Sequence, residues 1–82
     1  MPPSGSPDLA LARALRAIRE SQGRSQESVA YAAGISVNAL RRVEYGKSNP
    51  TWTTVRVIVE ALSVTLAELE LRMQQAAPGD GR

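Results

Sequence analysis

The 82-residue chain contains no cysteine, no histidine and no phenylalanine, and it has one tryptophan and two tyrosines. Without cysteine it can form neither a disulfide nor a thiolate metal site. Without histidine it lacks an imidazole base and the usual ligand of zinc. Its carboxylates form no catalytic motif. We therefore expect neither an enzyme nor a protein that holds a metal or another cofactor.

Long apolar runs are also missing, and no segment is long enough to predict a membrane span. The start of the chain lacks the pattern of a signal peptide. A chain of this length is expected to form one small domain, near the lower limit for folding on its own core. These absences predict a protein of the reducing cytoplasm.

Residues 25–45 have the pattern of two short helices joined by a tight turn. Ser25 and Ser36 each stand where a hydroxyl can accept a hydrogen bond from the first turn of a helix. Gly34 lies between the two segments, and glycine takes the left-handed conformation that ends a helix at little cost. The pattern therefore predicts a helix-turn-helix with helices over residues 26–33 and 37–45.

The second of these helices is predicted to have an apolar and a polar face. Leu40 and Val43 form the stripe that faces inward. The outer face is predicted to carry five residues: Val37, Asn38, Arg41, Arg42 and Tyr45. Such a face suits the DNA major groove, where arginine and asparagine can pair with base edges. The same pattern also occurs in all-α proteins that bind no DNA, in which the arginines are only solvated.

The net charge of +2 is unevenly distributed along the chain. Residues 13–56 hold eight basic and three acidic side chains, a local balance of +5. From residue 57 onward the balance is −2. The basic part coincides with the predicted helix-turn-helix, as expected for a protein that contacts phosphates. Because the excess is modest, we expect binding that weakens strongly with salt and that relies on two copies of the chain.

Matches to one family of regulators are spaced along most of the chain. They are Arg16, Arg19, Gln26, Val29-Ala30, Gly34-Ile35-Ser36, Leu40, Glu44, Gly46-Lys47, Pro50-Thr51, Val55, Ile58, Ala61-Leu62 and Val64. On these residues the sequence resembles the DNA-binding domain of the Cro and lambda-repressor class, the xenobiotic-response-element type of bacterial and phage regulators. The resemblance covers roughly residues 9–70. It implies an all-α, five-helix, lambda-repressor-like domain that binds double-stranded DNA.

The resemblance also implies which residues contact DNA. The base-reading positions of the family match Val37, Asn38 and Arg42. Contacts to the DNA backbone match Gln26, Ser36, Arg41, Lys47, Ser48 and Asn49. Asparagine can pair with adenine and arginine with guanine. Val37 departs from the glutamine that is common in the family, and an apolar side chain can only pack against a group such as a thymine methyl.

Two further expectations for the motif come from the same family. An arginine and a glutamate that match Arg19 and Glu44 form an ion pair there, which ties the first helix to the end of the recognition helix. A glutamine that matches Gln26 often braces a side chain of the recognition helix. From the residues alone, Tyr31 is expected to pack with its hydroxyl in water. Trp52 is expected to be half exposed and to pack over the loop, with contact to the DNA backbone or to a partner as the alternatives.

The boundaries of the domain are predicted from caps and composition. We expect a flexible arm over residues 1–5, the helix-turn-helix domain over residues 6–75 and a flexible tail over residues 76–82. Ser6 is the predicted N-cap of the first helix, with Pro7 at its first position and Asp8 in its first turn.

The segment over residues 65–75 permits two interpretations. Thr65 and Glu68 have the spacing of a capping box, which predicts a fifth helix. The alternation of polar and apolar residues from 68 to 73 is also compatible with a dimerising strand. We favour the helix because the segment after Thr65 holds strong helix formers and no β-branched residue.

A homodimer is expected because one recognition helix reads too few base pairs for useful specificity. The candidate interface consists of Val64, Leu66, Leu69, Leu71 and Met73. The alternative is that these side chains complete the thin core of a single chain.

The sequence therefore predicts a transcriptional regulator, specifically a repressor that binds a palindromic operator as a homodimer. One alternative is an antitoxin that binds both DNA and a toxin protein. Another is an adaptor that keeps the fold but reads no DNA.

Overall fold

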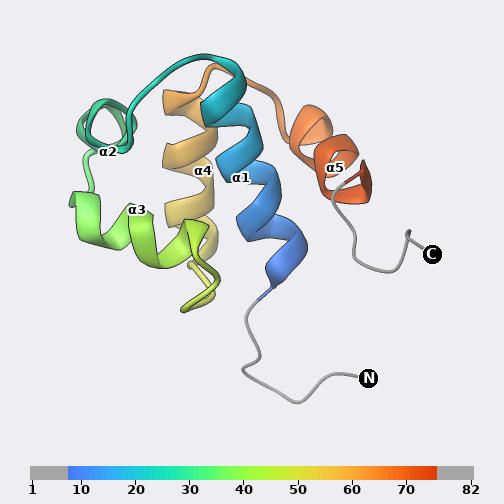
Figure 1. Ribbon diagram of the computed structural model, residues 1–82, viewed down its shortest axis with the longest axis horizontal. Helices are drawn as coiled ribbons and strands as arrows, with labels where there is room; N and C mark the ends of the chain where they lie inside the picture. Colours follow the sequence, from blue (N-terminus) through green and yellow to red (C-terminus); the bar gives the residue numbers. More distant parts are fainter. Residues whose placement is uncertain (1–7, 76–82) are drawn as a thin grey trace.

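Five α-helices follow one another along residues 8–75, the part of the chain that the computed structural model describes (Figure 1). They are α1 (Leu9–Ser21), α2 (Gln26–Ala33), α3 (Val37–Glu44), α4 (Trp52–Ala61) and α5 (Leu66–Gln75). This confirms the predicted all-α fold, including a helix rather than a strand over the last segment. The arm and tail predicted at residues 1–5 and 76–82 lie outside the described residues. Within the described part, no helix is both long and apolar enough to cross a bilayer.

Side chains at the helix N-termini satisfy amides that have no partner inside the helix. The hydroxyls of Ser25, Ser36 and Thr51 each accept from the backbone amide three residues later, at 3.0, 3.0 and 3.1 Å. Thr65 and Glu68 form the predicted capping box, in which each side chain accepts from the other residue's amide at 3.0 and 2.7 Å. Each such cap stabilises its helix by about 1 kcal/mol.

The start of α1 differs from the prediction. Asp8 is the N-cap rather than a first-turn residue, and its Oδ1 accepts from the amide of Leu11 at 3.1 Å. Ser6 and Pro7 lie outside the described residues. An aspartate caps a helix as well as serine does, and its charge is favourable at the positive end of the helix dipole. Its own amide donates to Oδ1 of Asn49 at 2.6 Å, which ties this helix end to the loop after α3.

Gly34 makes the turn of the helix-turn-helix. It has a φ of 75°, in the left-handed region that side chains with a Cβ rarely adopt. Beyond it, the amide of Ile35 returns to the carbonyl of Ala30 at 3.0 Å and closes the end of α2. Because of this tight turn, α3 begins at Val37, just two residues after Ile35.

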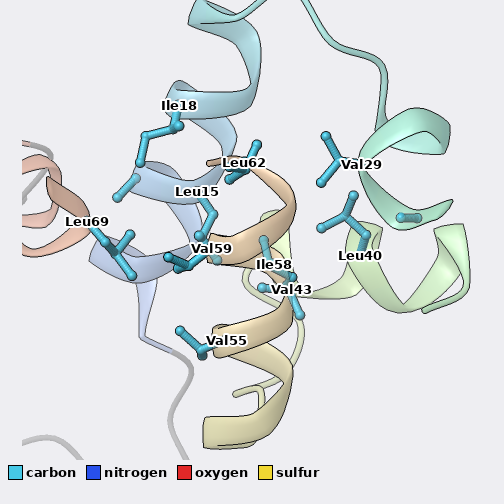
Figure 2. Packing of buried hydrophobic residues seen from close by; sticks show 12 residues of the cluster. Leu15, Ile18, Val29, Leu40, Val43, Val55, Ile58, Val59, Leu62 and Leu69 are labelled. Atoms are coloured by element: carbon cyan, nitrogen blue, oxygen red, sulfur yellow. The ribbon is translucent and has the colours of Figure 1, made fainter. Parts of the chain in front are cut away.

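The core lies where all five helices meet (Figure 2). Figure 1 shows α1 and α4 in the middle, with α2 and α3 on one side and α5 on the other. Accordingly, α1 packs against α3 and α5, and α2 packs against α3 and α4. The largest fully buried side chains are Leu15, Val29, Leu40, Ile58 and Leu62. Truncating one such leucine to alanine typically costs about 2–5 kcal/mol, so this small core holds α3 firmly in place.

The turn between α1 and α2 also closes the C-terminal end of α4. Nε2 of Gln22 donates to the carbonyl of Leu62 at 2.7 Å, and Nη1 of Arg24 donates to the carbonyl of Ala61. The last carbonyls of a helix have no partner within it, so these side chains satisfy groups that would otherwise depend on water. Arg24 is thereby a structural residue of the fold.

The predicted dimer residues fall into two groups. Leu69 is only 4% exposed and belongs to the core of the single chain, which corrects its placement in an interface between copies. Val64 and Met73 are partly buried against the same core. Leu66 and Leu71 are exposed large apolar residues. Thus three of these side chains complete the core of the single chain, and two remain on the surface, where a contact with a second copy stays a prediction.

Candidate nucleic-acid interface

The outer face of α3 presents fewer of the predicted residues than its sequence pattern suggested. Asn38, Arg42 and Tyr45 are exposed, and Arg41 is partly exposed. Val37 instead is half-buried and packs against the core. This corrects its placement on the outer face: as the first residue of α3, it lies where the turn joins the body of the domain.

Arg19 and Glu44 form an ion pair that joins α1 to the end of α3. Nε of Arg19 donates to Oε2 of Glu44 at 2.8 Å, and Nη2 donates to Oε1 at 3.0 Å. Glu44 is a buried charged residue, only 4% exposed. The hydrogen bond with Glu44 is the main reason that the pKa of Arg19 is raised above its usual value, so the guanidinium stays charged. Nη1 of Arg19 also donates to the carbonyl of Arg24 at 2.8 Å.

Gln26 connects this ion pair to the outer face of α3. Its Nε2 donates to Oε1 of Glu44 at 3.0 Å, and its Oε1 accepts from Nε of Arg41 at 3.3 Å. The first residue of α2 therefore braces a side chain of the recognition helix, the role that the family resemblance implies for it. The side-chain carboxamide of Gln26 thus donates to Glu44 and accepts from Arg41, both on α3. These two bonds fix how α2 and α3 lie against each other.

Arg41 makes two more contacts within the protein. Its Nη1 donates to Oδ1 of Asn38 at 3.4 Å, and its Nη2 lies 3.7 Å from Oε2 of Glu27. By contrast, the side chain of Arg42 makes no hydrogen bond or ion pair with another residue within 8–75. The two adjacent arginines thus differ: Arg41 is held by its neighbours on α2 and α3, and the exposed Arg42 projects away from the domain.

The three predicted backbone contacts in the loop after α3 differ in how accessible they are. Lys47 is exposed and Ser48 is half-buried. Oδ1 of Asn49 accepts from the amide of Asp8 at 2.6 Å, so part of this side chain positions the loop itself. At the other end of α3, Ser36 is exposed and its hydroxyl caps the helix.

Sequence reasoning missed Glu27 and misplaced Tyr31. The sequence gives a weak signal for Glu27: it is an acid in the first turn of α2, next to Gln26, which faces α3. That signal alone does not predict a contact with Arg41. Tyr31 is 89% exposed, so it is not packed as predicted, and Trp52 is 62% exposed, somewhat more than the half that was expected. Trp52 instead borders an apolar groove of about 290 Å³ that Leu66 and Met73 also line.

The sequence was compared with families of known proteins. Residues 10–71 match the family described as "Helix-turn-helix domain", which spans most of the chain. The chain belongs to this helix-turn-helix family. The match confirms the resemblance to the Cro and lambda-repressor class, whose members are DNA-binding transcription regulators. No curated protein matches the chain significantly.

Solved structures of regulators share the fold. The restriction-modification controller protein C.AhdI from Aeromonas hydrophila is 27% identical, with a TM-score of 0.72 over 76% of this chain and 94% of that one. The clp gene regulator ClgR from C. glutamicum is 22% identical, with a TM-score of 0.82 over 88% of this chain and 94% of that one.

A third structure shows a related protein on DNA. The controller C.Esp1396I, solved as a tetramer in complex with its natural 35 base-pair operator, is 20% identical, with a TM-score of 0.77. The alignment covers 84% of this chain and 92% of that one. At this identity the likeness concerns the fold.

Proposed function

We propose that the protein is a transcriptional repressor that binds a palindromic operator as a homodimer. The observation that carries the proposal is the exposed face of α3, on which Asn38 and Arg42 project while Gln26 and the Arg19–Glu44 pair hold the helix from behind. A rigid helix with an exposed carboxamide and guanidinium is suited to pair with base edges in the major groove.

Charge supports the same proposal. The local balance of +5 over residues 13–56 includes the arginines of α3 and Lys47 in the loop after it. Positive charge around the reading helix favours association with the phosphate backbone irrespective of sequence. In this proposal Ser36, Arg41, Lys47 and Ser48 supply backbone contacts, and the protein acts where the DNA is, in the cytoplasm.

The dimer is proposed from the need for a longer site and from the relatives. C.Esp1396I is a tetramer in complex with its natural 35 base-pair operator. Two copies related by a two-fold axis would place their α3 helices in major grooves about 34 Å apart, one turn of DNA. The exposed Leu66 and Leu71 on α5 are available for contact with a second copy.

Selection from a pool of random duplexes tests the proposal, with the affinity then measured against salt concentration. A two-fold palindrome with half-sites about one helical turn apart is the expected result. The logarithm of the binding constant should fall with the logarithm of salt concentration by about 0.9 per phosphate contacted. An antitoxin would also bind DNA, but it would co-purify with a protein partner. Recovery of no preferred sequence would contradict the proposal.

A further inference from the structure

Glu27 is the second residue of α2, and its carboxylate faces the recognition helix. Its Oε2 lies 3.7 Å from Nη2 of Arg41, and the two side chains are 69% and 43% exposed. The pair therefore lies at the surface, on the side of the helix-turn-helix from which Asn38 and Arg41 project. A DNA phosphate that approaches Arg41 would meet the negative charge of Glu27 as well.

Arg41 has three acceptors within the protein, of which only Glu27 is charged. The other two are Oε1 of Gln26 at 3.3 Å and Oδ1 of Asn38 at 3.4 Å. All three distances are long for hydrogen bonds or exposed ion pairs, so each contact is weak. A phosphate binds a guanidinium more strongly, through two parallel (bidentate) hydrogen bonds. Glu27 and a phosphate thus compete for the same group.

We propose that Glu27 is a specificity-determining residue, which retains Arg41 in the free protein and so weakens binding to DNA that lacks the operator. The proposal rests on the operator binding proposed above. On a non-operator duplex only phosphate contacts are available, and Glu27 both repels phosphates and withholds Arg41 from them. On the operator the same cost is partly offset, because an Arg41 held by Glu27 also orients Asn38 for its base contact. Discrimination rises because the unwanted complex is penalised more than the correct one.

Arg41 links Glu27 to the reading surface in a second way. Because Nη1 of Arg41 donates to Oδ1 of Asn38, an arginine held by Glu27 also holds the carboxamide of Asn38 in one orientation. An asparagine in a fixed orientation loses less conformational freedom when it pairs with adenine. Loss of Glu27 should therefore reduce the advantage of the operator even where total affinity rises.

Glu27→Gln tests the proposal, because it keeps the size of the side chain and removes its charge. The probes are the duplex recovered by selection and the same duplex with its base order scrambled. For the scrambled duplex we expect the affinity to rise about two- to five-fold, the size of an exposed ion pair. Its salt dependence should steepen by about one unit, since a released Arg41 adds one phosphate contact. The operator should gain less, so that the ratio of the two affinities falls.

Glu60→Gln is the matched control. Glu60 is also 69% exposed, and it lies 4.0 Å from Arg56 within α4, away from Arg41. The change removes the same charge and the same kind of ion pair, and it should leave the ratio of affinities unchanged. Introducing Glu27→Gln into an Arg41→Ala protein completes a double-mutant cycle, in which the effect on the salt dependence should disappear.

Three results would overturn the proposal: an unchanged ratio in Glu27→Gln, an equal change in Glu60→Gln, or the same effect with and without Arg41. Each would mean that Glu27 acts through net charge alone or not at all. Thermal unfolding of every variant verifies that the domain is folded. If the wild-type protein recovers no operator, the proposed function fails; a specific wild-type protein with an unaffected Glu27→Gln variant refutes only the role of Glu27.

Discussion

Glu44 accepts three hydrogen bonds in a place that water hardly reaches. Two come from Arg19 and one from Gln26, on α1 and α2 respectively. A buried carboxylate is expensive to desolvate, and only such a complete set of donors makes it tolerable. Because Glu44 lies at the end of α3, these hydrogen bonds fix the recognition helix against α1 and α2 and offset the cost of burying the charge.

Glu44→Ala should therefore destabilise the fold strongly. Loss of one partner of a buried ion pair costs about 3–5 kcal/mol, and we expect about 3 kcal/mol because Arg19 keeps the carbonyl of Arg24 and some contact with water. Urea denaturation measures the change. Glu60→Ala, which breaks an exposed pair within α4, should cost less than about 1 kcal/mol. Similar losses from the two variants would contradict this account of Glu44.

Arg42→Ala should change which sequence the protein selects. Its guanidinium is exposed on α3, and an arginine that pairs with guanine contributes about 1–3 kcal/mol of discrimination. Selection with the variant should recover a motif that is degenerate at one position in each half-site. Arg56→Ala removes the same charge from an exposed position on α4 and should leave the motif intact. An unchanged motif in the Arg42 variant would rule out direct reading by this residue.

The prediction of individual residues succeeded where the family pattern specifies a partner and failed where only helical periodicity was available. The Arg19–Glu44 pair follows from two matched positions 25 residues apart. Periodicity placed Val37 on the outer face, but the first residue of a helix also packs against the turn before it. Tyr31 was predicted to pack from its place in the middle of a helix, yet α2 packs mainly against α3 and α4, and Tyr31 lies away from them at 89% exposure. The contact between Glu27 and Arg41 depends on how two helices cross, which no local pattern encodes.

At the scale of elements, helix ends were predicted better because they depend on local chemistry. Ser25, Ser36 and Thr51 cap their helices through hydroxyls that stand next to helix-forming segments. The fifth helix was favoured because its segment holds strong helix formers, and its predicted capping box is present in the structure. The N-cap of α1 was assigned to the wrong residue because the sequence offers two adequate caps close together; in the structure Asp8 takes the role, and its amide is tied to the loop after α3.

The end of α3 gives a prediction about the loop that follows it. Gly46 has a φ of 70°, and a Cβ at this position would lie 2.6 Å from Cδ2 of Leu9. Gly46→Ala should cost about 1–2 kcal/mol for the left-handed backbone. It should cost several tenths more for moving Leu9 out of its rotamer. Gly34→Ala has a similar φ of 75° but open space around the new Cβ, and is the matched control.

The two contributions can be separated by equilibrium denaturation in a background that lacks Leu9. In a Leu9→Ala protein, Gly46→Ala should cost no more than Gly34→Ala does. A Gly46 variant that remains more costly in that background would show that the loop, and not the contact with Leu9, requires glycine here.

At the scale of the whole molecule, a groove lies between α5 and the helices α1 and α4, and it is apolar except for Glu70. Trp52 and Leu66 are 62% and 43% exposed on the rim of the groove between α4 and α5, which Val55 and Met73 also line. On the other side of α5, Leu71 shares a smaller hollow with Glu68 and Arg72. Apolar area favours association only where it is continuous, so the side with Trp52 is the better surface for a second copy.

Leu66→Glu should therefore weaken the dimer more than Leu71→Glu does, because it places a charge on the apolar rim of the groove. Sedimentation across a range of protein concentrations measures the association. The single tryptophan gives a second readout: if the groove is covered in the dimer, the emission of Trp52 should shift to shorter wavelength as the wild-type protein is concentrated. The Leu66 variant should lack this shift and show about half the salt dependence of DNA binding, since one copy contacts half of the phosphates. A monomeric Leu71 variant with an associating Leu66 variant would place the interface on the opposite side of α5.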